Sequence, residues 1–160
     1  MADHFPGEIH IGGPIPRAAL RKLIRAAVDE DVSLEGYGGP DADAEDLRNA
    51  FQEGTIVRLC ADQARYGMFA VLERFLVDHR IHFDRSSEAF CEYNAEMVHY
   101  RGGKEAVVLP ADQNGNVLLC REDIAAVLDD ALLDASAKVE AIRRLVNPPD
   151  TEPLSPIRFT

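Results

Sequence analysis

Two kinds of hydrophobic periodicity alternate along this chain, and their alternation constrains the fold more than any other feature. Strands are predicted where apolar and polar residues alternate, at residues 9–11, 55–61 and 81–83. Helices are predicted where apolar residues recur every three or four positions, at residues 17–28, 43–54, 68–79 and 122–146. Because both kinds of segment are spread over the whole chain, an all-helical bundle is excluded.

The order of these elements predicts the fold class. After the third strand we expect a β-meander through residues 90–93 and 96–100, and Asn114 and Gly115 predict a tight hairpin because both residues tolerate positive φ. The helix over 122–146 is expected to be one long C-terminal helix. We therefore predict an α+β fold, a mainly antiparallel sheet with helices packed on it. Its architecture resembles a ferredoxin-like plait, a fold that hosts many functions and implies none by itself.

The length and the apolar content predict one domain. A chain of 160 residues with 46% hydrophobic residues is large enough for one core and small for two. We assign residues 1–147 to a single α+β domain and residues 148–160 to a proline-rich C-terminal tail. Pro148 and Pro149 end the last helix. The apolar residues of the tail are expected to attach it to the domain or to a neighbouring copy: Leu154, Ile157 and Phe159.

The charge balance argues against several classes of partner. With 17 basic and 28 acidic residues the net charge is −11, so nucleic acid and anionic membranes are not expected to bind. The first residues lack the basic and apolar regions of a secretion signal. The odd number of cysteines, three, and their apolar strand-like settings predict free, mostly buried thiols in a cytoplasmic protein: Cys60, Cys91 and Cys120.

The best small-ligand candidate lies between the first strand and the first helix. Gly12 and Gly13 form a turn that opens a helix, and Arg17 and Arg21 follow in its first turns. Backbone N–H groups and guanidinium groups in such a position bind anions. The complete glycine fingerprints of nucleotide-binding loops are missing, so a tight structural connection is the alternative interpretation.

Other groupings of reactive residues are weaker signals. His79 and His82, joined by Asp84, Cys91 or His99, have part of a metal-binding pattern, but without a closing ligand pair we predict surface or helix-end histidines, and no metal or cofactor. An acid–base cluster on neighbouring strands is a second possibility, with a solvated strand face as its alternative: Glu92, Glu96 and His99. No serine-nucleophile motif is present, so the chain is not predicted to be an enzyme.

Acidic residues are concentrated in two segments. Residues 29–53 contain nine acidic residues and one arginine, and residues 122–134 contain five acidic residues and no basic one. The interpretation that needs no specific function is a solvated surface that keeps the protein soluble. The functional hypothesis is a non-catalytic protein-interaction or regulatory module, with the terminal helix and the tail taking part and homodimerisation expected. The alternatives are a small enzyme or a binder of a phosphorylated or carboxylated ligand at residues 12–25, and an acidic mimic of nucleic acid.

Overall fold

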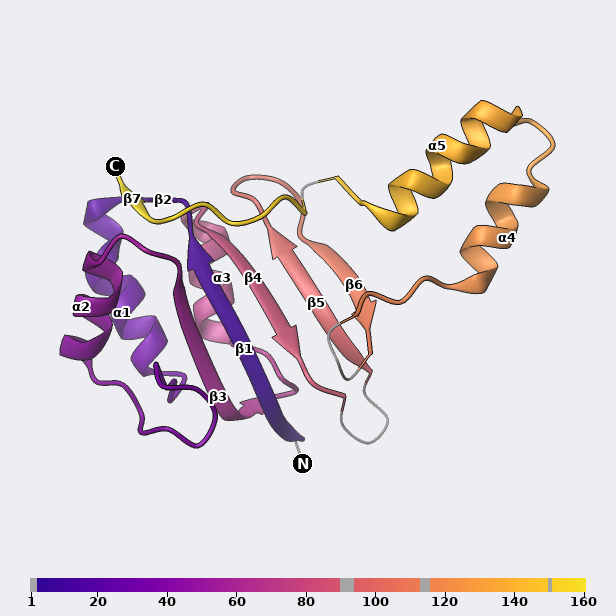
Figure 1. Cartoon of the computed structure of the whole chain (residues 1–160). Coiled ribbons are helices and arrows are strands. Elements are labelled where there is room, and N and C mark those ends of the chain that lie inside the picture. The colour runs from indigo at the N-terminus through magenta and orange to yellow at the C-terminus, as the bar shows by residue number, and fades with distance from the viewer. Residues whose placement is uncertain (1–2, 90–93, 113–115, 150) are drawn as a thin grey trace.

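The computed structural model describes residues 3–89, 94–112, 116–149 and 151–160, and it has an α+β fold (Figure 1). Its main sheet has five strands in the order β3-β1-β4-β5-β6, and every neighbouring pair is antiparallel. The strands of this sheet are β1 (His4–Gly12), β3 (Val57–Arg65), β4 (His82–Ser87), β5 (Ala95–Tyr100) and β6 (Val107–Ala111).

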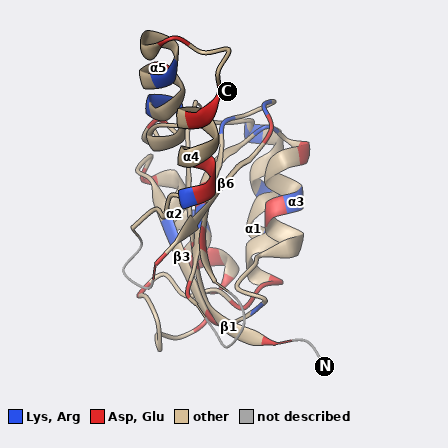
Figure 2. Cartoon of the chain, turned by 90° about the vertical axis from the view of Figure 1, so that its right-hand side faces the viewer, with Lys and Arg blue, Asp and Glu red and all other residues tan. Residues whose placement is uncertain are grey.

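Three helices enclose the core together with the sheet. They are α1 (Leu20–Val28), which follows a 3-10 turn η1 (Arg17–Ala19), α2 (Ala44–Gln52) and α3 (Ala70–Asp78). Helices α1 and α3 lie against one face of the sheet, and α2 packs against α1 beyond the β3 edge (Figures 1 and 2). In β1 the side chains of Ile9 and Ile11 point to the helices and are fully buried, while Glu8 and His10 alternate with them on the open face. This is the alternation that the sequence predicts for the first strand.

Carboxylates fix the beginnings of two of these helices. The predicted cap Asp43 accepts hydrogen bonds from the backbone N–H groups of Glu45 (2.7 Å) and Asp46 (2.9 Å), which completes a capping box at α2. At α3 the carboxylate comes from a distant segment, because Glu30 accepts from the N–H groups of Val71 and Leu72. The first cap is visible as a local sequence pattern, and the second arises only when the chain folds.

The C-terminal tail forms a second, two-stranded sheet with the start of the chain. Strand β7 (Arg158–Phe159) runs parallel to β2 (Pro14–Ile15), and Ile157 is buried in the main core. Figure 1 shows the tail crossing the end of the main sheet to reach this position. The tail is therefore attached to its own domain through the apolar residue Ile157, in agreement with one of the two arrangements that the sequence predicts.

The finer resemblance to a ferredoxin-like plait is not confirmed. That fold needs two strand–helix–strand units, each with a third strand between its two parallel strands. Here β3, α3 and β4 form one such unit around β1. The other connection contains two helices, α1 and α2, which return the chain to the end of the sheet where β1 finishes. As a result β3 runs antiparallel to β1 and lies directly beside it.

The predicted single helix over 122–146 is not confirmed either. Two helices take its place, α4 (Arg121–Asp129) and α5 (Ala135–Val146). Between them the side chain of Asp130 accepts the N–H of Leu132 (2.8 Å), and the side chain of Asp134 caps α5 by accepting the N–H of Ala137 (2.8 Å). Aspartate side chains that bind nearby N–H groups in this way compete with helix continuation, so the chain turns back at this point.

The predicted hairpin is observed in part. Its turn, Asn114 and Gly115, lies outside the described residues, as does the predicted meander strand 90–93. Ala111 and Val117 form an antiparallel bridge, and Leu118 N–H donates to the Pro110 carbonyl (2.8 Å). Beyond this pairing the chain leaves the sheet and leads into α4.

Candidate functional site

The most distinctive surface is a helical hairpin that projects from the domain. Residues 117–147, here called the arm, contain α4 and α5 and extend past the edge strand β6 on the side away from α1 and α2 (Figure 1). No residue of α4 or α5 is buried. The charges of the arm differ between its helices, because α4 has three acidic residues and one arginine, whereas α5 has three basic residues and one glutamate (Figure 2).

Apolar side chains of the arm are unusually accessible. Apolar residues of both helices, among them Ile124, Val127 and Ile142, are only half-buried. Leu132 is 94% exposed and Leu128 is 52% exposed, and Val139 and Val146 are exposed to a similar degree as Leu128. Isolated exposed apolar residues are common on protein surfaces, but a concentration of them typically marks an interaction surface.

The arm meets the sheet at an apolar cavity. This cavity has a volume of about 310 Å³ and lies between the edge strand β6, the connecting segment and the two arm helices. Its apolar lining comes from both sides: Val108, Pro110, Leu118, Ile124 and Leu145. The arm therefore contacts the domain through partly exposed side chains rather than through a continuous core.

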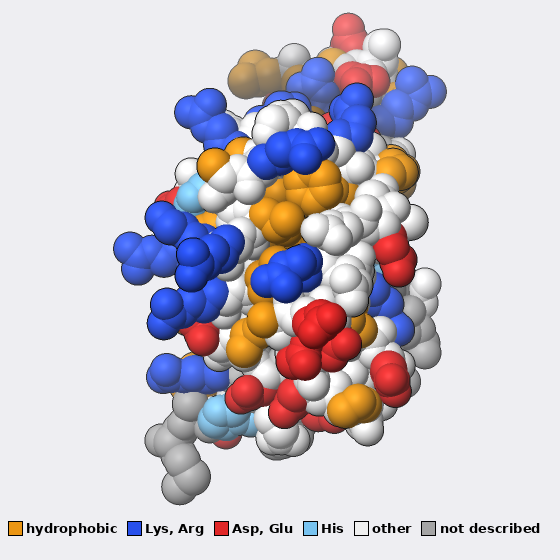
Figure 3. Space-filling view, turned by 90° about the vertical axis from the view of Figure 1, so that its left-hand side faces the viewer, with side chains coloured by type: hydrophobic (Ala, Val, Ile, Leu, Met, Phe, Trp, Pro, Cys, Tyr) orange, Lys and Arg blue, Asp and Glu red, His pale blue; other side chains and the backbone are white. Residues whose placement is uncertain are grey.

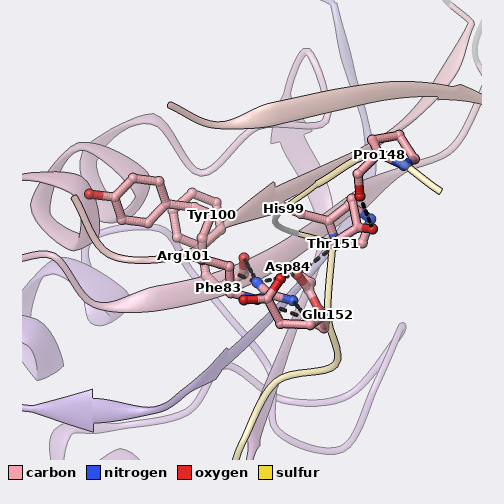
Figure 4. Close-up of polar contacts among 8 residues, drawn as sticks. All are labelled: Phe83, Asp84, His99, Tyr100, Arg101, Pro148, Thr151 and Glu152. Carbon is pink, nitrogen blue, oxygen red and sulfur yellow. Dashed lines mark hydrogen bonds and ion pairs between the residues drawn. The ribbon is translucent and has the colours of Figure 1, made fainter. Parts of the chain in front are cut away.

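A buried polar cluster holds the chain where it returns from the arm (Figure 4). Arg101, which is 4% exposed, donates from Nη1 to Asp84 Oδ1 (2.7 Å) and from Nε to the Glu152 carbonyl (2.9 Å). The same Nη1 also contacts the carbonyl oxygens of Phe83 and Tyr100. We call Asp84, His99 and Arg101, together with the Glu152 carbonyl, the tail anchor.

The electrostatics of the tail anchor suit a structural role. Burial by itself raises the pKa of Asp84, but hydrogen bonds from His99 Nδ1 (2.8 Å) and from Arg101, together with the positive charge of Arg101, outweigh it and hold the pKa of Asp84 below its ordinary value. The ionised carboxylate thus binds both neighbours, and Arg101 uses its remaining donors on carbonyl groups. Sequence analysis missed this cluster, because nothing in the local pattern marks Arg101 as buried.

The predicted anion site is arranged differently from the expectation. Gly12 and Gly13 do join a strand to the helical region, but the Gly13 N–H donates to the Ser155 carbonyl (2.8 Å). A side chain at Gly12 would lie 2.4 Å from the same oxygen, so the tail needs a glycine there. Arg17 N–H likewise donates to the Thr160 carbonyl (3.0 Å). The backbone donors of the turn are therefore held by the tail.

Arg17 and Arg21 do lie together, in a groove between α1 and α2. This groove has a volume of about 740 Å³ and is lined by helix residues rather than by a facing strand. The guanidinium of Arg17 also lies over the ring of Phe159 in the tail, with 5.6 Å from Cζ to the ring centroid. Two of the four predicted site residues are thus brought to a ligand-sized surface, and the two glycines are not part of it.

Among the residues that the structure describes, the weaker candidate clusters are not assembled. His79 donates from Nδ1 to the Phe75 carbonyl (2.9 Å) and stacks on the Phe75 ring. Glu96 forms an ion pair with the buried Arg85, whereas His99 belongs to the tail anchor on the opposite face of the sheet. Cys91 and Glu92 lie outside the described residues. Within the described part of the chain, no three His, Cys, Asp or Glu side chains form a group suited to a metal ion.

The two described thiols differ from each other. Burial, and to a lesser extent the charge of Glu8, raises the pKa of Cys60 to about 11, so this thiol is unreactive at neutral pH. Cys120 is free but exposed, against the prediction of burial, and its Sγ lies 2.8 Å from Glu122 Oε2. The strand-like residues before Cys120 belong to the segment that leaves the sheet, which explains the difference.

Comparisons with known proteins give no family. No family model, no curated protein and no solved structure matches the chain. Among the described residues, none of the helices combines the length and the apolar character needed to cross a membrane.

Proposed function

We propose that this protein is a non-catalytic protein-interaction module that contacts its partner through the arm. The observation that supports the proposal is a helical hairpin without a single buried residue, in which the side chains of Leu128 and Leu132 are exposed to solvent. The tail anchor and the β2–β7 pairing hold the part of the chain that follows the hairpin. The arm would thus present its interaction surface at a fixed position on the folded domain.

The energetics favour burial of the arm by a partner. Full burial of one leucine side chain contributes about 1.5–3 kcal/mol, so Leu128 and Leu132 together offer several kcal/mol to a complex. Within the arm itself this free energy is realised only in part, because Leu132 is 94% exposed and Leu128 is 52% exposed. Binding also has an entropic cost, because translational and rotational freedom is lost. A preformed hairpin adds little to this cost, because its own chain is already ordered.

A second candidate function rests on the groove between α1 and α2. Five of its lining residues are cationic and none is acidic, which suits a phosphorylated or carboxylated ligand. In the described residues the buried polar side chains Arg85 and Arg101 are both engaged in ion pairs. The groove is therefore a candidate for binding.

The role of the arm is tested by affinity capture from the native host with the full chain. The double variant Leu128→Gln, Leu132→Gln removes the exposed apolar surface without a change in charge. A matched control is Val71→Gln on α3, because Val71 is exposed to 55% and lies outside the arm. We expect the arm variant to lose its captured partner while the control retains it. Equal capture by wild type and arm variant would contradict the proposal.

A further inference from the structure

The groove between α1 and α2 carries a concentration of positive charge in an otherwise acidic protein. Its cationic lining residues are Arg17, Arg21, Lys22, Arg25 and Arg48. Figure 3 shows the end of the molecule that carries α1 and α2, where Lys and Arg side chains surround apolar atoms. We call this surface the basic groove.

The charges of the basic groove are not paired within the described part of the chain. Among the residues that the structure describes, no carboxylate lies within ion-pair distance of any of its five cations. Three arginines elsewhere in the domain do have such partners, since Arg58, Arg85 and Arg101 each form an ion pair with a nearby carboxylate. The basic groove therefore presents a positive potential to an external partner.

The floor of the basic groove is apolar. Leu20 and Val28 are half-buried, and Ile24 is buried between them on the same face of α1. A small inorganic anion would satisfy the guanidinium groups but leave this floor exposed to water. The surface is matched better by a segment that carries carboxylates beside large aliphatic side chains.

The chain contains such a segment at the end of its own arm. Residues 128–134, here called the tip, include three carboxylates and the most exposed leucine of the described residues: Asp129, Asp130, Asp134 and Leu132. Leu128, also exposed, lies in the last turn of α4, four residues before Leu132. The tip thus has the two properties that the basic groove requires, negative charge and exposed aliphatic surface.

The tip and the basic groove lie at opposite ends of one molecule (Figure 1). They therefore meet only between two molecules. We propose that the tip of one molecule docks into the basic groove of a second copy, with leucine side chains on the apolar floor and aspartates beside the arginines. This inference rests on the proposed function of the arm and names its partner as a second copy of the chain.

The contact uses two different surfaces, so it is a heterologous interface. Each molecule retains a free tip or a free groove after one contact, and repetition gives either a closed ring or an open chain of molecules. The net charge of −11 opposes close approach, which confines attraction to the complementary surfaces. Ion pairs at the rim of the contact are screened by salt, so the association weakens as ionic strength rises.

Two variants of the full chain separate the halves of the contact. The groove variant, Arg21→Glu with Arg25→Glu, reverses charge in the basic groove and keeps the tip. The tip variant, Asp129→Lys with Leu132→Gln, alters the tip and keeps the groove, and it spares Asp130 and Asp134, whose side chains bind backbone N–H groups. A control with the same charge change as the groove variant is Arg65→Glu with Arg74→Glu, at exposed positions outside both surfaces. Circular dichroism checks that each variant is folded.

Sedimentation velocity over increasing protein concentration gives the readout. We expect the wild type and the control to associate, and each variant alone to have an affinity lower by about tenfold or more. An equimolar mixture of the two variants is expected to form a one-to-one complex, because one supplies an intact tip and the other an intact groove. Association of the wild type with no complex in the mixture would overturn the proposed pairing.

The same measurements distinguish the two proposals. A wild type that remains monomeric at high micromolar concentration overturns self-docking. If the arm variant then still loses its captured partner, the interaction role of the arm holds and the partner is a different protein. If capture is also unchanged, both proposals are wrong.

Discussion

Helices α3 and α4 have the same length and similar apolar spacing, but they occupy opposite environments. Each spans nine residues, and each contains leucine or other aliphatic residues at helical intervals. Leu72 and Leu76 of α3 are fully buried against the sheet, whereas α4 buries no residue. The difference teaches that amphipathic character predicts a helix without telling which surface will cover it. In the domain the covering surface is the chain itself, and at the arm we propose that it is a partner.

The largest expected effect contrasts a core residue with an arm residue of comparable chemistry. Phe51 is fully buried in α2, so Phe51→Ala leaves a cavity and should lower the free energy of unfolding by about 3–5 kcal/mol. Leu132→Ala removes a side chain that is 94% exposed and should change it by about 0.5 kcal/mol or less. Urea denaturation followed by circular dichroism measures both. A large loss for Leu132→Ala would mean that the arm belongs to the core, and the comparison would fail.

A substitution in the tail anchor tests whether the arm is held in place by the chain that follows it. Arg101→Met removes the donor to Asp84 and to the Glu152 carbonyl, leaving a partly exposed carboxylate without its charged partner. We expect a loss of about 2–3 kcal/mol, below the usual cost for a fully buried pair. Relative to the wild type, backbone hydrogen exchange in the variant should become faster in the tail and the arm, and it should change less in α1–α3. Uniform exchange changes over the whole chain would contradict a local anchor.

A smaller and pH-dependent effect comes from Asp84. Its pKa is lower in the folded protein than in the unfolded chain, so its contribution to stability is present above the ordinary aspartate pKa and is lost as pH falls through the folded value. The wild type should therefore lose more stability than Asp84→Asn as the pH falls below about 4. Urea denaturation at several pH values measures the difference. Parallel pH profiles for the two proteins would show that the anchor does not depend on an ionised Asp84.

Parts of the fold could be predicted because the signals are local. The alternation around Ile9 and Ile11 predicts a half-buried strand from side-chain geometry alone. Asp43 predicts the start of α2 because a cap acts over three residues. The basic residues of α1 are likewise apparent from helical spacing, although the groove that they form with Arg48 depends on the position of α2.

Other features depended on contacts between distant residues. The sequence by itself determined that strands and helices alternate, although not the break between α4 and α5, that acidic charge is concentrated near residues 29–53 and 122–134, and that a proline-rich segment follows residue 147. Only the tertiary structure decided that the Ser155 carbonyl in the tail accepts a hydrogen bond from the Gly13 N–H, and that Arg101 is buried beside Asp84. The physical reason is the range of each interaction: periodicity and capping act within a few residues, whereas burial and ion pairing depend on which surfaces the folded chain brings together.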